Sequence, residues 1–78
     1  MEFRKGELVV CTAGREKDQL MCVVASDEKY VYVCDGKERL LNNPKRKNPK
    51  HVIKTNKQLS EDLLLTDRAL RKALSKEV

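Results

Sequence analysis

The sequence has 78 residues, 37% of them charged, and a formal net charge of +5. This length predicts one small domain, and the apolar runs are far shorter than the ~20 residues of a membrane-spanning helix. Three cysteines without a close pair exclude a disulfide framework and indicate a reducing, cytoplasmic compartment. The charged N-terminal segment is unlike a secretory signal, so we expect a soluble chain without membrane contact.

The first forty residues predict four short antiparallel strands. Residues 7–11 and 19–25 are rich in side chains that favour sheets, and residues 30–34 alternate in character. An Asp-Gly pair, which is a strong signal for a tight hairpin, follows them. We therefore expect residues 37–41 to form the fourth strand.

The alternation in residues 30–34 assigns their side chains to two faces of a sheet. Val31 and Val33 are expected on one face, and Tyr30, Tyr32 and Cys34 on the other. A face of two valines suits the interior of a small β domain.

Residues 42–50 contain two prolines and three asparagines, a composition that predicts a loop. Residues 51–54 are expected to form a fifth, brief strand. Five short strands closed by tight turns predict a mainly β fold in which residues 1–57 form a small barrel that includes the loop 42–50.

The last segment, residues 58–78, predicts a helical extension. Ser60 precedes a short turn near residues 61–64, and Thr66 is placed to cap a main helix over residues 67–76. An apolar stripe with four-residue spacing predicts that one helix face packs on the barrel: Ala69, Leu70, Ala73 and Leu74. The alternative is a helix that docks on RNA or on a protein partner.

Positive charge is concentrated in one part of the chain. Residues 37–57 hold eight Lys or Arg and one acidic residue, which gives +7, whereas residues 1–36 sum to −2 and residues 58–78 to 0. One basic segment on a near-neutral chain is typical of a protein that binds a polyanion.

Residues 5–18, "KGELVVCTAGREKD", resemble the KOW motif, a strand and loop of ribosomal proteins and transcription elongation factors. Gly6 and Glu7 match its opening, Val9 and Cys11 its inward alternation, and residues 14–17 its loop. Asp18 departs from the motif, which has a second glycine there.

The likeness extends over about residues 5–54. "VYVCDGK" and "RLLNNPKRKNPKHV" are similar to a eukaryotic large-subunit ribosomal protein family, and closer still to short bacterial KOW-domain RNA-binding proteins that end in a basic helix. The resemblance implies an SH3-like barrel that binds RNA, often ribosomal RNA.

The loop at residues 14–18 is the first candidate contact. Gly14 permits the turn, and we expect Arg15 and Lys17 to reach phosphates, with Asp18 as a turn residue. Glu16 and Asp18 are expected to halve the local positive field. The alternative is a solvated turn that is charged because it is exposed.

The second candidate is the basic segment, where positive charges have almost no acid nearby in sequence. A solvated charge run is the plainer interpretation, but this concentration favours binding. The expected contacts are Lys45, Arg46, Lys47 and Lys50, with Lys37, Arg39, Lys54 and Lys57 extending the surface. Alternation would place Lys37 and Arg39 on one face of their strand.

The scarcity of aromatic residues indicates how a nucleic acid would be recognised. Phe3, Tyr30 and Tyr32 make no platform for a run of single-stranded bases. For Tyr30 and Tyr32 the alternatives are stacking on exposed bases and, for one of them, packing against the barrel. We expect recognition of the backbone and shape of structured RNA, and only the family resemblance favours RNA over DNA.

No constellation of residues predicts an enzyme, a cofactor or a metal. Cys11, Cys22, Cys34 and His51 lack the close pairs of a zinc site and fit buried thiols better. We therefore predict a cytoplasmic, ribosome-associated RNA-binding protein. The competing hypothesis is an SH3-like module that binds an acidic protein partner.

Overall fold

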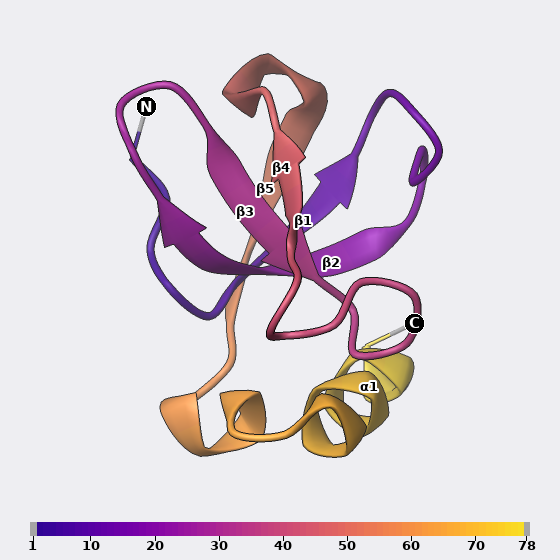
Figure 1. Ribbon diagram of the computed structural model, residues 1–78. Coiled ribbons are helices and arrows are strands. Elements are labelled where there is room, and N and C mark those ends of the chain that lie inside the picture. Colours follow the sequence, from indigo (N-terminus) through magenta and orange to yellow (C-terminus); the bar gives the residue numbers. More distant parts are fainter. Residues whose placement is uncertain (1, 78) are drawn as a thin grey trace.

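One antiparallel β-sheet organises the fold. The structure, a computed structural model, describes residues 2–77. Its strands are β1 (Glu7–Cys11), β2 (Leu20–Ser26), β3 (Val31–Cys34), β4 (Lys45–Lys47) and β5 (Val52–Gln58). They are arranged in the order β4-β3-β2-β1-β5 (Figure 1). No ladder joins β4 to β5 within the described residues, so the sheet is open between these two edges.

The sheet is strongly twisted and bent (Figure 1). Strand register shifts at two places, between Glu7 and Val9 where β1 meets β5, and between Val23 and Ala25 where β2 meets β3. Irregularities of this kind increase the local twist and bend a strand. The bend lets a short sheet enclose apolar side chains on one of its faces.

Each face of the sheet carries its own set of buried side chains. As the alternation predicts, Val31 and Val33 share one face, and Cys34 lies on the other. The first set, the inner core, consists of Phe3, Val9, Cys11, Met21, Val23, Val31, Val33 and Val52. The second set, the helix-side core, consists of Leu8, Cys22, Cys34, Leu64, Leu70 and Leu74.

The C-terminal segment supplies half of the helix-side core. A short 3₁₀ helix, η2 (Glu61–Leu64), and the helix α1 (Asp67–Lys76) form over the residues that the sequence predicts. The Thr66 side chain caps α1 by accepting a hydrogen bond of 3.1 Å from the Ala69 amide. Ser60 precedes η2 without such a bond. Among residues 2–77, no helix is both long and apolar enough to cross a membrane.

The predicted strand over residues 37–41 is wrong. One carboxylate oxygen of Asp35 accepts hydrogen bonds from the amides of Lys37, Glu38 and Arg39, which curls the chain into a compact loop. The preceding Gly36 has φ 76°, and a Cβ there would collide with the backbone of α1. The Asp-Gly pair therefore allows the backbone of α1 to pack closely against this loop, and it does not form a two-residue hairpin.

The segment 42–50 is more regular than predicted. It contains the edge strand β4, which pairs with β3, and the start of a second 3₁₀ helix, η1 (Pro49–His51). The two prolines flank β4, where no ladder amide is lost. The last strand, β5, begins at Val52 and is longer than the brief strand expected from the sequence.

If the helix is part of the same folded unit, removing its central leucine must destabilise the whole chain. Leu70 is fully buried, so Leu70→Ala is expected to lower the free energy of unfolding by about 2–5 kcal/mol in urea titrations. Leu65 is 77% exposed, and Leu65→Ala should change it by less than about 0.5 kcal/mol. Equal effects of the two variants would contradict a shared core.

Candidate nucleic-acid interface

The loop between β1 and β2 is a compact turn. The Asp18 amide donates to the Cys11 carbonyl at 2.7 Å, and the Lys17 amide donates to the Gly14 carbonyl at 3.2 Å. Gly14 and Asp18 both have positive φ, 82° and 69°. Aspartate is one of the few residues with a side chain that tolerates this backbone region. The turn leaves the side chains of Arg15 and Lys17 exposed.

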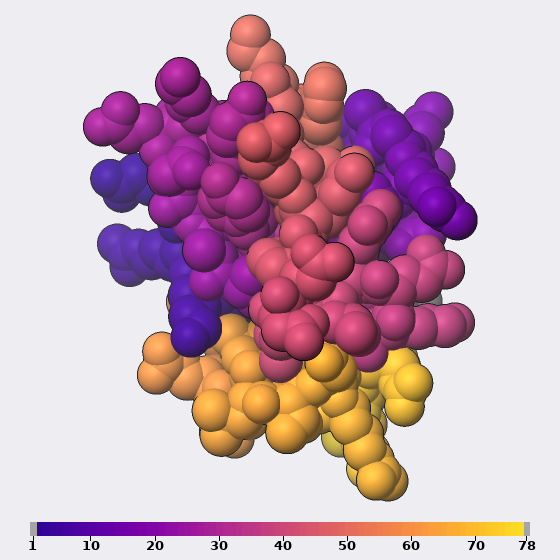
Figure 2. All heavy atoms as spheres, viewed as in Figure 1, coloured from indigo at the N-terminus to yellow at the C-terminus, as the bar shows by residue number. Residues whose placement is uncertain are grey.

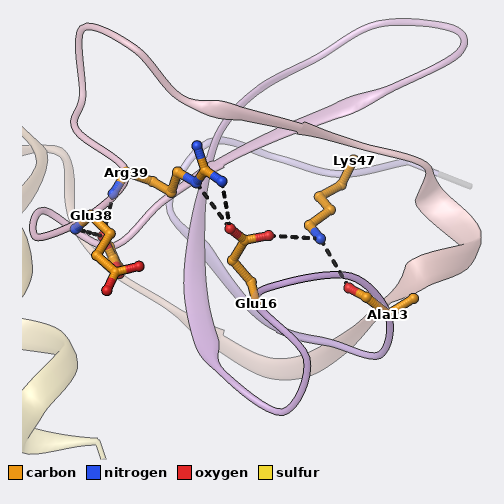
Figure 3. A network of polar contacts seen from close by, with 6 residues as sticks. Ala13, Glu16, Glu38, Arg39 and Lys47 are labelled. Carbon is orange, nitrogen blue, oxygen red and sulfur yellow. Dashed lines mark hydrogen bonds and ion pairs between the residues drawn. The ribbon is translucent and has the colours of Figure 1, made fainter.

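Glu16, in the middle of this exposed turn, is only 2% exposed. Its Oε2 accepts hydrogen bonds from Arg39 Nε at 3.0 Å and Nη2 at 2.8 Å, and its Oε1 lies 2.9 Å from Lys47 Nζ (Figure 3). Lys47 Nζ also donates to the Ala13 carbonyl at 3.0 Å. One carboxylate therefore connects the β1–β2 loop, the loop after β3 and the edge strand β4.

The two cations keep this carboxylate ionised. Burial alone would raise the pKa of Glu16, but the hydrogen bonds from Lys47 and Arg39 outweigh it and lower the pKa to about 2. The prediction that Glu16 weakens the field of the exposed loop is therefore corrected, because its charge is compensated inside the fold. Asp18 is the acid of this loop that remains exposed.

The basic residues predicted as contacts fall into two groups. Arg39 and Lys47 are paired with Glu16, and Lys54 lies 3.5 Å from Glu7 and over the Phe3 ring. Lys57, in the extension of the predicted surface, is paired with Glu77 at 2.8 Å. The others make no ion pair within residues 2–77 and are named the unpaired cations: Arg15, Lys17, Lys37, Lys45, Arg46 and Lys50.

The segments that carry the unpaired cations meet on one side of the molecule. In Figure 2 the segment 42–50 occupies the centre of the visible face, with the loop 12–19 at its upper right and the loop 36–41 beside it. Lys37 and Arg39 do not share a strand face as predicted: Lys37 is exposed, whereas Arg39 turns to Glu16. The side chain of Lys45 is half-buried, and those of Arg46 and Lys50 are exposed.

Sequence reasoning did not identify the role of Glu16. Its charged neighbours in sequence suggested a solvated residue, and its partners are 23 and 31 positions away. One signal was available: the basic segment contains a single acid, Glu38. A cation of that segment that becomes buried must therefore find its counter-ion elsewhere in the chain.

The cysteines are parts of the two cores. Cys11 lies in the inner core, and Cys22 and Cys34 face each other beneath α1. Burial raises the pKa of Cys22 to about 11 and that of Cys34 to about 12, so both thiols are neutral at physiological pH. His51 is exposed on η1, and residues 2–77 contain no group of three or more His, Cys, Asp or Glu placed to hold a metal.

Comparison with known proteins does not assign the site. The sequence matches no protein-family model and no curated protein. The chemistry of the surface is therefore inferred from its own residues, which are six unpaired cations on three segments joined by one buried carboxylate.

Glu16→Gln is expected to destabilise the fold, because it leaves Lys47 buried without a full counter-charge. The free energy of unfolding should fall by about 3 kcal/mol in urea titrations. Glu77→Gln removes an exposed partner of Lys57 and should cost less than about 1 kcal/mol. Equal, small decreases in the free energy of unfolding of both variants would show that the ion pairs of Glu16 do not stabilise the fold.

The same carboxylate predicts acid sensitivity. The pKa of Glu16 is lowered from 4.5 to about 2 on folding, so its stabilisation is present above about pH 4.5 and is lost as the pH falls toward 2. The loss attributable to this group is about 3 kcal/mol. It is measured as the difference between the wild-type and Glu16→Gln unfolding free energies across that range. A constant difference would contradict the assignment.

Proposed function

We propose that this chain is an RNA-binding domain that docks electrostatically on folded RNA. The observation that carries the proposal is that the three segments that bear the unpaired cations meet on one side of the molecule and are joined by a buried carboxylate. Clustered Lys and Arg attract phosphates, and each phosphate contact releases condensed counter-ions into solution. The proposed contact residues are the six unpaired cations.

Three residues predicted from sequence have a different role in this proposal. Arg39 and Lys47 are paired with the buried Glu16, and Lys54 is paired with Glu7 at 3.5 Å. Because their charges are engaged, they are less available to a phosphate than Arg46 or Lys50. The surface that contacts RNA is therefore smaller than the basic segment of the sequence.

The fold type in this proposal is an SH3-like barrel of the KOW kind. Five antiparallel strands bent around an inner core support it, together with the likeness of residues 5–18 to the KOW motif. The positive φ values of Gly6 and Gly14 support the opening and the loop of the motif. Asp18, in place of the second glycine, has the backbone conformation that glycine readily supplies, so the departure at this position is conservative in geometry.

Ribosomal RNA is the class of target that we propose, with the cytoplasm as the compartment. The resemblance to ribosomal KOW proteins favours RNA over DNA, and a surface that carries several cations suits the phosphates of a folded RNA. Three buried free thiols are compatible with a reducing compartment. Phosphate contacts fix the position of the domain on the RNA, and the shape of the RNA selects the place.

The proposal predicts a steep and localised salt dependence. The chain is titrated with folded ribosomal RNA transcripts at increasing salt, and the slope of log affinity against log salt is measured. Each phosphate neutralised adds roughly 0.7–0.9 to the magnitude of this slope. Lys45→Gln, Arg46→Gln and Lys50→Gln combined should weaken binding and reduce the slope by about 2.

The matched control neutralises three exposed cations of α1: Arg68→Gln, Lys72→Gln and Lys76→Gln. It changes the net charge equally and is expected to leave the slope nearly unchanged. Equal losses in both variants would mean that only overall charge matters. Salt-independent RNA affinity, or protein capture that survives removal of all RNA, would favour an acidic protein partner and overturn the proposal.

A further inference from the structure

The face of β3 that carries Tyr32 is only partly covered. Towards the end of β3 this face is buried by η2 and α1, which pack on Cys34. At the start of β3, the Tyr30 and Tyr32 side chains remain half-exposed. Strand pairing places Arg46 of β4 directly opposite Tyr32, so these two side chains share the uncovered part of the face.

Tyr30, Tyr32 and Arg46 form a cluster, named the shelf, whose side chains are held by contacts with their neighbours. The Arg46 guanidinium carbon lies 4.5 Å from the centre of the Tyr30 ring, a stacking distance. The Tyr32 hydroxyl donates to Asp27 Oδ2 at 2.9 Å. Asp27 Oδ1 accepts from the amides of Lys29 and Tyr30, which fixes the turn beneath the shelf. The shelf borders a shallow hollow of about 400 Å³ between this turn and Arg46.

We propose that this shelf stacks one unpaired base of the bound RNA. Tyrosine rings and guanidinium planes are the protein surfaces on which splayed bases stack, and here the Arg46 guanidinium lies over the Tyr30 ring. This inference rests on the proposed function, since Arg46 is also one of the six proposed contact residues.

The charge of the shelf favours a nucleotide over a cationic ligand. Arg46 already lies over the Tyr30 ring, and its positive charge repels a second cation. The acid closest to the rings, Asp27, is engaged by two amides and the Tyr32 hydroxyl. The exposed Glu28 and Lys29 also line the hollow and offset each other in charge. Arg46 then supplies a planar cation that complements the π-face of a base and the negative charge of its phosphate.

The test compares two single-stranded probes of equal charge, an oligoadenylate of twelve nucleotides and an abasic ribose-phosphate oligomer of the same length. Binding of each to the whole chain is measured at low salt by fluorescence anisotropy. A stacked base should make the oligoadenylate bind about ten-fold more tightly. Equal affinities, or no binding of the oligoadenylate, would overturn the stacking proposal.

Two pairs of variants separate stacking from charge. Tyr30→Leu should abolish the preference for the oligoadenylate, whereas Tyr30→Phe retains the ring and should keep it. Arg46→Lys retains the charge but loses the planar group, so the preference should fall while the salt slope on folded ribosomal RNA stays unchanged. Thermal unfolding verifies that each variant is folded.

The two proposals fail in different ways. If no base stacks on the shelf, the salt slope on folded RNA stays unchanged, and only the difference in affinity between the two probes is absent. Failure of the proposed function removes the salt-dependent affinity for every RNA. A preference for the oligoadenylate that persists in both Tyr30→Leu and Arg46→Lys would place the stacked base elsewhere and overturn the assignment.

Discussion

The arrangement of the basic surface depends on one buried carboxylate. Glu16 is held between Arg39 and Lys47, and each of the three residues comes from a different segment of the chain. A buried acid is costly unless it is paired and hydrogen-bonded, and here both oxygens face cations. Two positive charges and one negative charge leave a residual positive charge under the surface. The network fixes two loops and the edge strand β4 with respect to one another.

The ion pairs also explain why the net charge of residues 37–57 overestimates the number of cations that are available to a ligand. Four of the eight basic residues in 37–57 are paired with acids that lie outside that segment. Those acids are Glu7, Glu16 and Glu77, so the compensation is created by folding and is invisible to a count along the chain. The cations that remain unpaired are the ones with charge available to a ligand.

Local patterns in the sequence predicted the parts of the fold that depend on local physics. The apolar stretches of β1, β2 and β3 and the stripe and Thr66 cap of α1 lie where expected, since periodicity and capping are properties of near neighbours. Strand β4 was missed because "KRK" has no sheet propensity of its own. It becomes a strand through pairing with β3, with Lys47 directed inward to Glu16. The position of Arg46 over the Tyr30 ring also depends on the pairing of β4 with β3, so the local sequence does not predict it.

The hydrophobic and ionic parts of the structure are coupled through the loop after β3. Asp35 accepts the Arg39 amide, and Asp67 of α1 accepts the Leu41 amide at 2.7 Å, so the backbone on both sides of residue 40 is fixed. Gly36 lies against the helix backbone in the same loop. Packing of Leu70 and Leu74 on the sheet therefore helps to position the guanidinium that pairs with Glu16. In this way the helix contributes to the order of the surface that carries the unpaired cations.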